Sequence, residues 1–152
     1  MTPQVAAGGS AALGLVCALG MGFVMSRWIR VFSGWSALAQ AYPERGEAPR
    51  PRTLGSGVFR GWFGYNNSIF YSTDSAGLHM TALPILMSGH EPICIPWSEL
   101  ERVEEKRAWY GSSLRLVTRS AAGVDFAIRG RVASQIKARM ETAGVPILLE
   151  NS

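Results

Sequence analysis

Side chains that could bind a metal or attack a substrate gather in one short stretch of this sequence. The stretch contains His79, His90, Glu91 and Cys94, and so both histidines of the chain. Zinc binds such side chains at about 2.0–2.3 Å. However, a proline lies two residues before Cys94 and another lies two residues after it, which favours an extended chain. Residues four apart in a strand are separated by about 13 Å. His90 and Cys94 therefore cannot share one zinc ion, and we predict no metal ligand and no cofactor.

The sequence predicts no catalytic residue either. Cys94 has an isoleucine on each side, which indicates a buried and unreactive thiol. The glycine-rich segments 55–57 and 61–64 lack the lysine and the helix start of a phosphate-binding loop. A hydrolase built on His90 and Cys94 stays an alternative, which requires a histidine within hydrogen-bond reach of Cys94 or Ser98 in a cleft. We expect a non-enzymatic protein.

An apolar segment precedes the part of the chain that contains these residues. Residues 1–26 carry no charged side chain and are apolar from Val5 to Met25. About 20 helical residues, at 1.5 Å per residue, cover the roughly 30 Å hydrocarbon core of a bilayer. The pattern therefore predicts a transmembrane anchor over residues 1–26. A removable signal peptide is the competing interpretation, but it requires Lys or Arg before its apolar core, and residues 1–10 contain neither.

The charges that flank the anchor predict its orientation. Arg27 and Arg30 follow the apolar segment, and positive flanks stay on the cytoplasmic side. We therefore expect a single-pass membrane protein with its C-terminal domain in the cytoplasm. The net charge is +4, and the arginines between residues 27 and 52 suit anionic lipid headgroups. Nucleic acid is not an expected partner, because the arginines of the C-terminal half alternate with glutamates.

A second helix is predicted directly after the anchor, over residues 27–42. Its aromatic and apolar side chains recur at intervals of three and four residues, which aligns them on one helical face. Such a face suits the headgroup region, and it equally suits packing on the domain. An extended linker rich in proline follows over residues 43–55. The residues that we expect at the membrane are Arg27, Trp28, Arg30, Phe32 and Trp35.

Small side chains recur every fourth residue within the anchor. Ser10, Gly14, Ala18 and Gly22 therefore form one stripe on a helix. Two helices can approach closely along such a stripe, which predicts a possible homodimer through the transmembrane helix. The alternative is that the stripe reflects only the abundance of Gly, Ala and Ser in this segment.

The rest of the chain, residues 56–147, reads as one β-rich domain. Seven segments alternate polar and apolar residues between turn-forming residues, and we expect seven antiparallel strands with turns at 65–67, 74–77 and 120–123. Val132, Ile136 and Met140 then mark the buried face of one C-terminal helix over residues 131–142. The expected strands are 58–63, 68–73, 77–83, 92–97, 102–109, 113–119 and 124–129.

Short sequence motifs in this domain resemble those of a known family. The segment 90–100, which ends in Ile-Pro-Trp-Ser-Glu-Leu, resembles bacterial PH-like (pleckstrin-homology) and GRAM-like domains, as does 77–80. The segment 33–42 is similar to a group of membrane-anchored bacterial proteins of uncharacterised function that carry this domain. The resemblance implies a fold that is mainly β with α: a PH-like barrel capped by its terminal helix. Within it, we expect Trp97 and Leu100 to fill the core.

The expected function is a protein-binding or scaffolding module at the membrane, with membrane lipids and an unidentified protein as partners. PH domains that bind inositol phosphates carry a basic cluster between their first two strands, whereas this chain has Arg60 and then the neutral segment 64–68. A partner protein is therefore expected at a sheet edge or beside the terminal helix. The alternative is a barrel that binds a lipid or small molecule in its interior.

Overall fold

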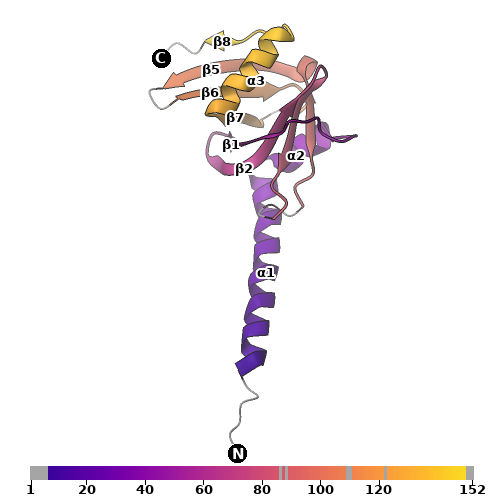
Figure 1. The fold of residues 1–152 in the computed structure, drawn as a ribbon, viewed down its shortest axis with the longest axis vertical. Helices are drawn as coiled ribbons and strands as arrows, with labels where there is room; N and C mark the ends of the chain where they lie inside the picture. The colour runs from indigo at the N-terminus through magenta and orange to yellow at the C-terminus, as the bar shows by residue number, and fades with distance from the viewer. Residues whose placement is uncertain (1–6, 86, 88, 109–110, 122, 150–152) are drawn as a thin grey trace, which may run out of the picture.

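The structure, a computed structural model, describes residues 7–85, 87, 89–108, 111–121 and 123–149. A long N-terminal helix leads into a curled β-sheet that carries a second long helix on one side (Figure 1). The elements are α1 (Ala7–Phe32), α2 (Trp35–Ala41), β1 (Thr53–Phe59), β2 (Phe63–Thr73), β3 (Gly77–Ala82), β4 (Ile93–Pro96), the 3-10 helix η1 (Trp97–Glu99), β5 (Leu100–Ala108), β6 (Gly111–Thr118), β7 (Asp125–Arg129), α3 (Arg131–Thr142) and β8 (Leu148–Leu149).

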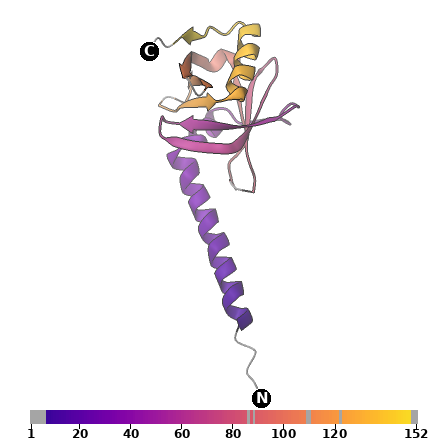
Figure 2. The same cartoon turned by 60° about the vertical axis from the view of Figure 1, so that its left-hand side comes forward.

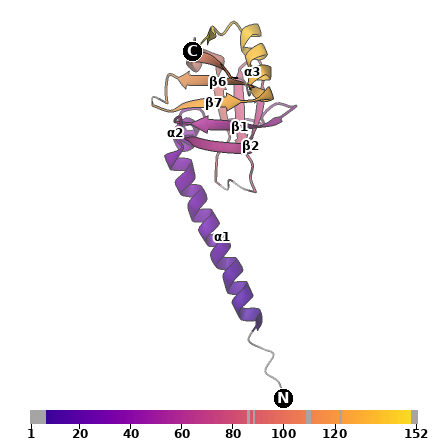
Figure 3. The ribbon, with the colours of Figure 1, turned by 90° about the vertical axis from the view of Figure 1, so that its left-hand side faces the viewer.

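Helix α1 extends away from the rest of the molecule for most of its length (Figures 1 and 3). Its segment Ala11–Phe32 is long and apolar enough to cross a membrane, and only 6% of an apolar stretch of 18 residues within it is buried. Residues 11–25 are all exposed, apolar side chains included. Since large apolar side chains usually gain about 1.5–3 kcal/mol each from burial, a helix of this composition without protein around it suits a lipid environment.

The chain changes direction at Gly34, between α1 and α2. Gly34 has φ of +86°, and a Cβ at this position would meet the Val124 side chain at 2.8 Å. Glycine is therefore required both by the backbone conformation and by the close packing. The Ser33 hydroxyl accepts a hydrogen bond from the Trp35 amide at 3.3 Å, as expected for a residue that starts a new helical turn. The single helix expected over residues 27–42 is thus two helices.

One sheet of eight strands forms the domain, in the order β4-β3-β2-β1-β7-β6-β5-β8. Six of the seven expected strands are present, but the expected strand 58–63 was misplaced, because residues 60–62 form the turn between β1 and β2. The eighth strand, β8, is an addition that pairs in parallel with β5. The sheet is therefore not purely antiparallel, and it forms a curled half-barrel. The turn expected at 65–67 was wrong, because Tyr65 is a fully buried residue inside β2. Likewise, β1 begins at Thr53, within the expected linker.

Helix α3 packs against β6, β7, β1 and β2 and covers one side of the curl (Figure 2). Its three periodic apolar side chains Val132, Ile136 and Met140 are buried, as predicted from their spacing. Trp97 and Leu100 are buried too, in agreement with their expected place in the core. The centre of the core contains a cluster of aromatic rings from α2, β1, β2 and β7, formed by Trp35, Phe59, Tyr65 and Phe126.

Candidate functional site

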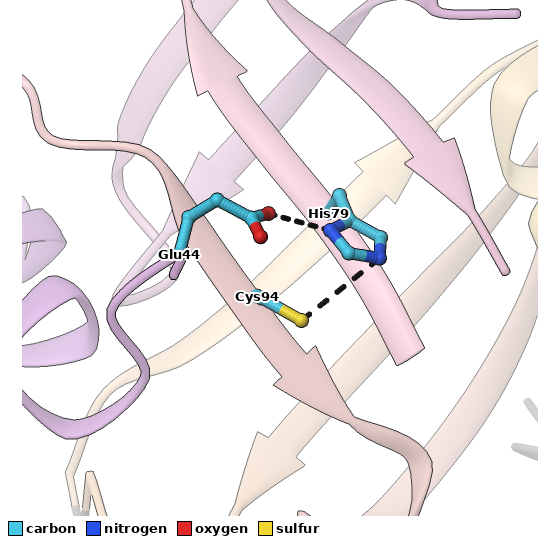
Figure 4. A group of neighbouring side chains, drawn as sticks. All are labelled: Glu44, His79 and Cys94. Carbon is cyan, nitrogen blue, oxygen red and sulfur yellow. Dashed lines mark hydrogen bonds and ion pairs between the residues drawn. The ribbon is translucent and has the colours of Figure 1, made fainter. Parts of the chain in front are cut away.

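A cluster of polar side chains lies at the β3–β4 end of the sheet (Figure 4). His79 Nδ1 is 2.5 Å from Glu44 Oε2, and His79 Nε2 is 3.9 Å from Cys94 Sγ. Glu44, His79 and Cys94 each offer a ligand atom, and these atoms lie within 4.8 Å of one another. We call this group the His79 cluster. Among the described residues it is the one group of His, Cys and acidic side chains with spacing suited to a metal ion.

Strand register and the chain after α2 build the His79 cluster. His79 in β3 pairs directly with Cys94 in β4, and side chains opposite each other in antiparallel strands lie on the same face. The segment after α2 then runs along the outer edge of β4, because the Glu44 amide donates to Pro92 O at 3.1 Å and the Cys94 amide donates to Tyr42 O at 3.0 Å. These bonds cover the β4 edge and bring Glu44 over His79.

Asp74 adds a second carboxylate on the other side of the imidazole. Its Oδ2 lies 3.1 Å from His79 Nε2, while its Oδ1 accepts hydrogen bonds from the amides of Ala76 and Gly77 at 2.8 and 2.9 Å. Partial burial alone would raise the pKa of Asp74. The amide of Gly77, His79 and the amide of Ala76 outweigh this, so that the pKa of Asp74 is lowered. Asp74 is therefore an ionised and well-oriented group.

Cys94 differs from its expected setting. Its strand neighbours Ile93 and Ile95 are fully buried, but alternation along β4 directs Cys94 to the opposite face, where it is only half-buried. Burial first, and then the negative charges of Glu44 and Asp74, raise its pKa to about 11. The sulfur is thus a thiol at neutral pH, which argues against a cysteine nucleophile even though His79 is nearby.

The arrangement allows two kinds of chemistry. Both ring nitrogens of His79 face carboxylate oxygens, so an imidazolium that donates from both nitrogens would satisfy both contacts. A transition-metal ion could equally use the nitrogen, sulfur and carboxylate donors. The side chains of His79 and Glu44 are only 6% and 9% exposed, so either cation would be held in a site with little water.

His90, the other candidate, lies in a different network. Its Nε2 is 3.1 Å from the Tyr65 hydroxyl, which is 2.8 Å from the Ser33 hydroxyl. Its ring also contacts Trp35 edge-on. Burial raises the pKa of Tyr65 to about 12, although the Ser33 hydrogen bond opposes the shift. His90 therefore belongs to the junction between α1 and the domain, and the histidine that lies beside Cys94 is His79 instead.

The residues expected at the membrane fall into two groups. Arg27, Trp28 and Phe32 are exposed, with the two aromatic rings stacked at 5.5 Å. Arg30 is tied to the domain, because its Nη1 donates to Gly89 O at 2.6 Å and lies 3.4 Å from Glu91 Oε1. Trp35 requires a correction: it is fully buried in the core, and its indole nitrogen donates to Glu91 O at 2.9 Å. Of the two interpretations of this face, packing on the domain holds for Trp35.

The expected stripe for helix pairing stays a prediction. Gly14, Ala18 and Gly22 are exposed on α1, and a Cβ at either glycine would have open space around it. Ser10 lies in the first turn of α1, and its side chain is outside the described part of the structure.

Glu44 and Asp74 were not predicted as site residues. Asp74 was interpreted as a turn residue only and Glu44 as part of a linker, because no local spacing connects either of them to His79. The Asp74-Ser75-Ala76-Gly77 turn was a usable signal, because it fixes the carboxylate at the start of the strand that carries His79. Comparison of the chain with protein-family models and with curated proteins finds no match.

Proposed function

We propose that this chain is a single-pass membrane protein of bacteria whose PH-like domain acts as a protein-binding or scaffolding module on the cytoplasmic face of the inner membrane. The observation that carries the proposal is the direct connection between an exposed apolar helix and the core of the domain. Only two residues, Ser33 and Gly34, separate α1 from α2, and both are buried. The domain is therefore held against the end of a possible membrane span and has no free tether.

Polar contacts reinforce this junction. Arg30, in the last turn of α1, binds Gly89 O and Glu91 in the segment that connects β3 to β4. The Ser33 hydroxyl binds Tyr65 in β2. Trp35 then packs on Phe59 with a ring separation of 5.6 Å. A helix fixed to three separate strands or loops transmits a defined orientation to the domain.

The loop between β3 and β4 supports a position close to lipid. It extends from the sheet in the same general direction as α1 (Figures 2 and 3). Ile85 in this loop is 90% exposed, the highest value among the large apolar side chains of the described residues. Trp28 is 57% exposed at the end of α1. Apolar and aromatic side chains at this level suit the interface between headgroups and hydrocarbon.

The far edge of the sheet is the candidate surface for a partner protein. The β4 edge is covered by the segment after α2, whereas β8 ends the sheet at the other side. Leu148 and Leu149 of β8 are 55% and 65% exposed. An exposed sheet edge with apolar side chains can accept an extended peptide as an additional strand. We therefore assign the partner's binding site to β8.

The alternative, a carrier with a ligand inside the barrel, has less support. The space between the sheet and its covering helices is filled by large side chains with no exposure, which include Trp35, Phe59, Tyr65 and Phe126. A carrier for a lipid or a small molecule needs a sizeable apolar cavity instead.

Membrane attachment and orientation can be tested with the full chain. After carbonate washing, we expect the protein in the membrane fraction with its N-terminal segment retained. An alkaline phosphatase fused after Ser152 should be inactive, because this enzyme requires the periplasm. A washed-off protein that begins near Arg27 would contradict the anchor, and an active fusion would contradict the orientation.

Partner binding can be tested by photocrosslinking in native membranes. A crosslinking amino acid at Leu149 should capture one defined protein, and the same group at exposed Trp62 in the β1–β2 turn serves as the control. Replacement of Leu148 by Lys should abolish the adduct while membrane attachment is unchanged. Identical adducts from both positions, or no adduct from Leu149, would contradict the assigned surface.

A further inference from the structure

We propose that Glu44, His79 and Cys94 bind a zinc-type transition-metal ion, with Asp74 as a positioning residue that accepts a hydrogen bond from the free ring nitrogen of His79. This inference goes beyond the proposed membrane role, which requires no metal. It rests on the donor types, their separations and the charge of the cluster. The three ligands come from different segments of the chain: the segment after α2, β3 and β4.

The separations are close to those of a bound ion. The three ligand atoms lie within 4.8 Å of one another. The shortest separation, 2.5 Å between His79 Nδ1 and Glu44 Oε2, is that of a direct hydrogen bond, which an ion between the two atoms would replace. Ligand atoms around a tetrahedral zinc ion, with bonds of about 2.0–2.3 Å, are about 3.3–3.8 Å apart. Shifts of about 1 Å in the side chains therefore suffice to form the site. One nitrogen, one sulfur and one carboxylate oxygen favour zinc over magnesium or calcium, which prefer oxygen ligands alone.

Asp74 suits the outer position. With the metal on Nδ1, beside Glu44, the other ring nitrogen carries a hydrogen and donates to Asp74 Oδ2 across 3.1 Å. The second carboxylate oxygen is held by two backbone amides, so Asp74 is fixed in place. A carboxylate behind a metal-binding histidine orients the ring and increases its basicity.

The charge of the cluster also calls for a cation. Glu44 and Asp74 are two carboxylates beside a buried ring, and of the described residues only His79 forms an ion pair with either of them. A divalent ion that displaces the thiol proton would face the charges of two carboxylates and one thiolate. An imidazolium between the two carboxylates leaves the same net charge of one negative unit, so charge calls for a cation on the ring and the nitrogen and sulfur donors are what favour a metal ion over a proton.

Solvent reaches the neighbourhood of the site at Asp74. Asp74 has 37% of its side chain exposed and lines a depression of about 660 Å³ that it shares with Trp97 and Arg139. A bound ion would join the segment after α2 to β3 and β4. Metal occupancy would thereby stiffen the connection between the membrane helix and the sheet.

The competing arrangement is an imidazolium between two carboxylates with no metal. The two can be separated with the full chain in detergent micelles, with Cys17→Ser as the background so that Cys94 is the remaining thiol. We expect one Co²⁺ per chain, with thiolate-to-cobalt charge-transfer absorption, and displacement of cobalt by Zn²⁺.

Variants then assign the ligands. Cys94→Ser should abolish the charge-transfer band, and Glu44→Gln should weaken zinc binding by at least about tenfold. Asp74→Asn should weaken binding by about tenfold while the band remains. Glu91→Gln removes an exposed carboxylate near the same strand and serves as the matched control, with unchanged affinity.

Two results would overturn the proposal. One is the absence of stoichiometric cobalt or zinc binding by the folded Cys17→Ser chain at micromolar metal. The other is binding that Glu44→Gln and Glu91→Gln leave equally strong. Tryptophan fluorescence verifies that each variant is folded, and if Cys94→Ser does not fold, the cobalt spectrum of Glu44→Gln decides.

Discussion

Two buried ionisable side chains lie in different parts of this domain and have partners of opposite charge. His79, in β3, lies between the carboxylates of Glu44 and Asp74. Glu105 in β5 lies between two cations, with Lys137 of α3 at 2.7 Å and Arg107 at 3.2 Å. The side chains of His79 and Glu105 are only 6% and 4% exposed. The charge patterns are therefore mirror images.

The difference lies in what completes each group. Lys137 and Arg107 are basic side chains of the chain itself, so Glu105 has its counter-charges without any other species. Hydrogen bonding from Lys137, followed by that from Arg107, outweighs burial and lowers the pKa of Glu105. The His79 cluster, in contrast, has two acidic side chains around one ring, so its counter-charge has to come from a proton or a metal ion on that ring. The Glu105 group is thus a structural ion pair, and the His79 cluster is a site for a cation.

The largest effect is expected when the Glu105 group is broken. Lys137→Met should lower the free energy of unfolding by about 3 kcal/mol, because it leaves a buried carboxylate with only the exposed Arg107 as partner. Urea unfolding of the chain in micelles, followed by tryptophan fluorescence, measures this. The double variant with Glu105→Met should recover most of the loss, because no buried charge remains. A loss below about 1 kcal/mol for Lys137→Met would place Glu105 in contact with water.

A nearly equal effect of opposite sign is expected from zinc at the His79 cluster. At a free concentration of 100 times the dissociation constant, zinc should raise the free energy of unfolding by about 2.7 kcal/mol. The gain should be the same in Lys137→Met, because the two groups share no residue, and smaller in Glu44→Gln. A gain in wild type that Glu44→Gln retains in full would mean that zinc stabilises the fold from another place.

Acid should lower the free energy of unfolding through both groups, by a smaller amount that depends on pH. The pKa values of Glu105 and Asp74 are both lowered, so folding favours their charged forms. Their contribution to stability is present above the pKa of the unfolded chain, near 4, and is lost as the pH falls through the lower folded pKa. Each group changes the free energy of unfolding by at most about 1.4 kcal/mol per pH unit.

The measurement is the urea midpoint between pH 6 and pH 3. Glu105→Gln should be less sensitive to acid than wild type, and Asp74→Asn should show the same trend. If wild type and Glu105→Gln lose stability in parallel, then Glu105 titrates in the folded state as it does in the unfolded chain.

The smallest change in the free energy of unfolding is expected at an exposed ion pair, which serves as a reference for the two buried groups. Glu47 and Arg50 form a 3.3 Å ion pair in which both side chains are more than three-quarters exposed. Glu47→Gln should change the free energy of unfolding by no more than about 0.5 kcal/mol, because water and salt screen such a pair. A larger effect would mean that removal of any charge alters the stability of this protein, so that part of the loss in Lys137→Met is not specific to the Glu105 group.

Local pattern predicted the elements of this fold well. Apolar spacing in α3 correctly assigned Val132, Ile136 and Met140 to the core, and alternation located six of the seven expected strands. These successes share a cause, because the period of a helix or strand determines which side chains share a face. The errors arose where tertiary burial overrides turn propensity, as at Tyr65 in β2.

The candidate site was predicted only in part, by residue type. His79 and Cys94 were both noted as possible ligands, yet the spacing argument compared Cys94 with His90 in the same segment. The relevant neighbour is 15 residues away in sequence and directly opposite in the β3–β4 pairing. Glu44 is 35 residues from His79. No periodicity within a segment encodes such contacts.

The sequence by itself determined that an apolar segment without charged side chains precedes a β-rich domain with one terminal amphipathic helix, because composition and period act over a few neighbouring residues. Only the tertiary structure decided that Trp35 belongs to the core, that Glu44 covers His79, and that Lys137 meets Glu105. These three contacts depend on which strands and helices become neighbours, and that choice is made by the packing of the whole chain.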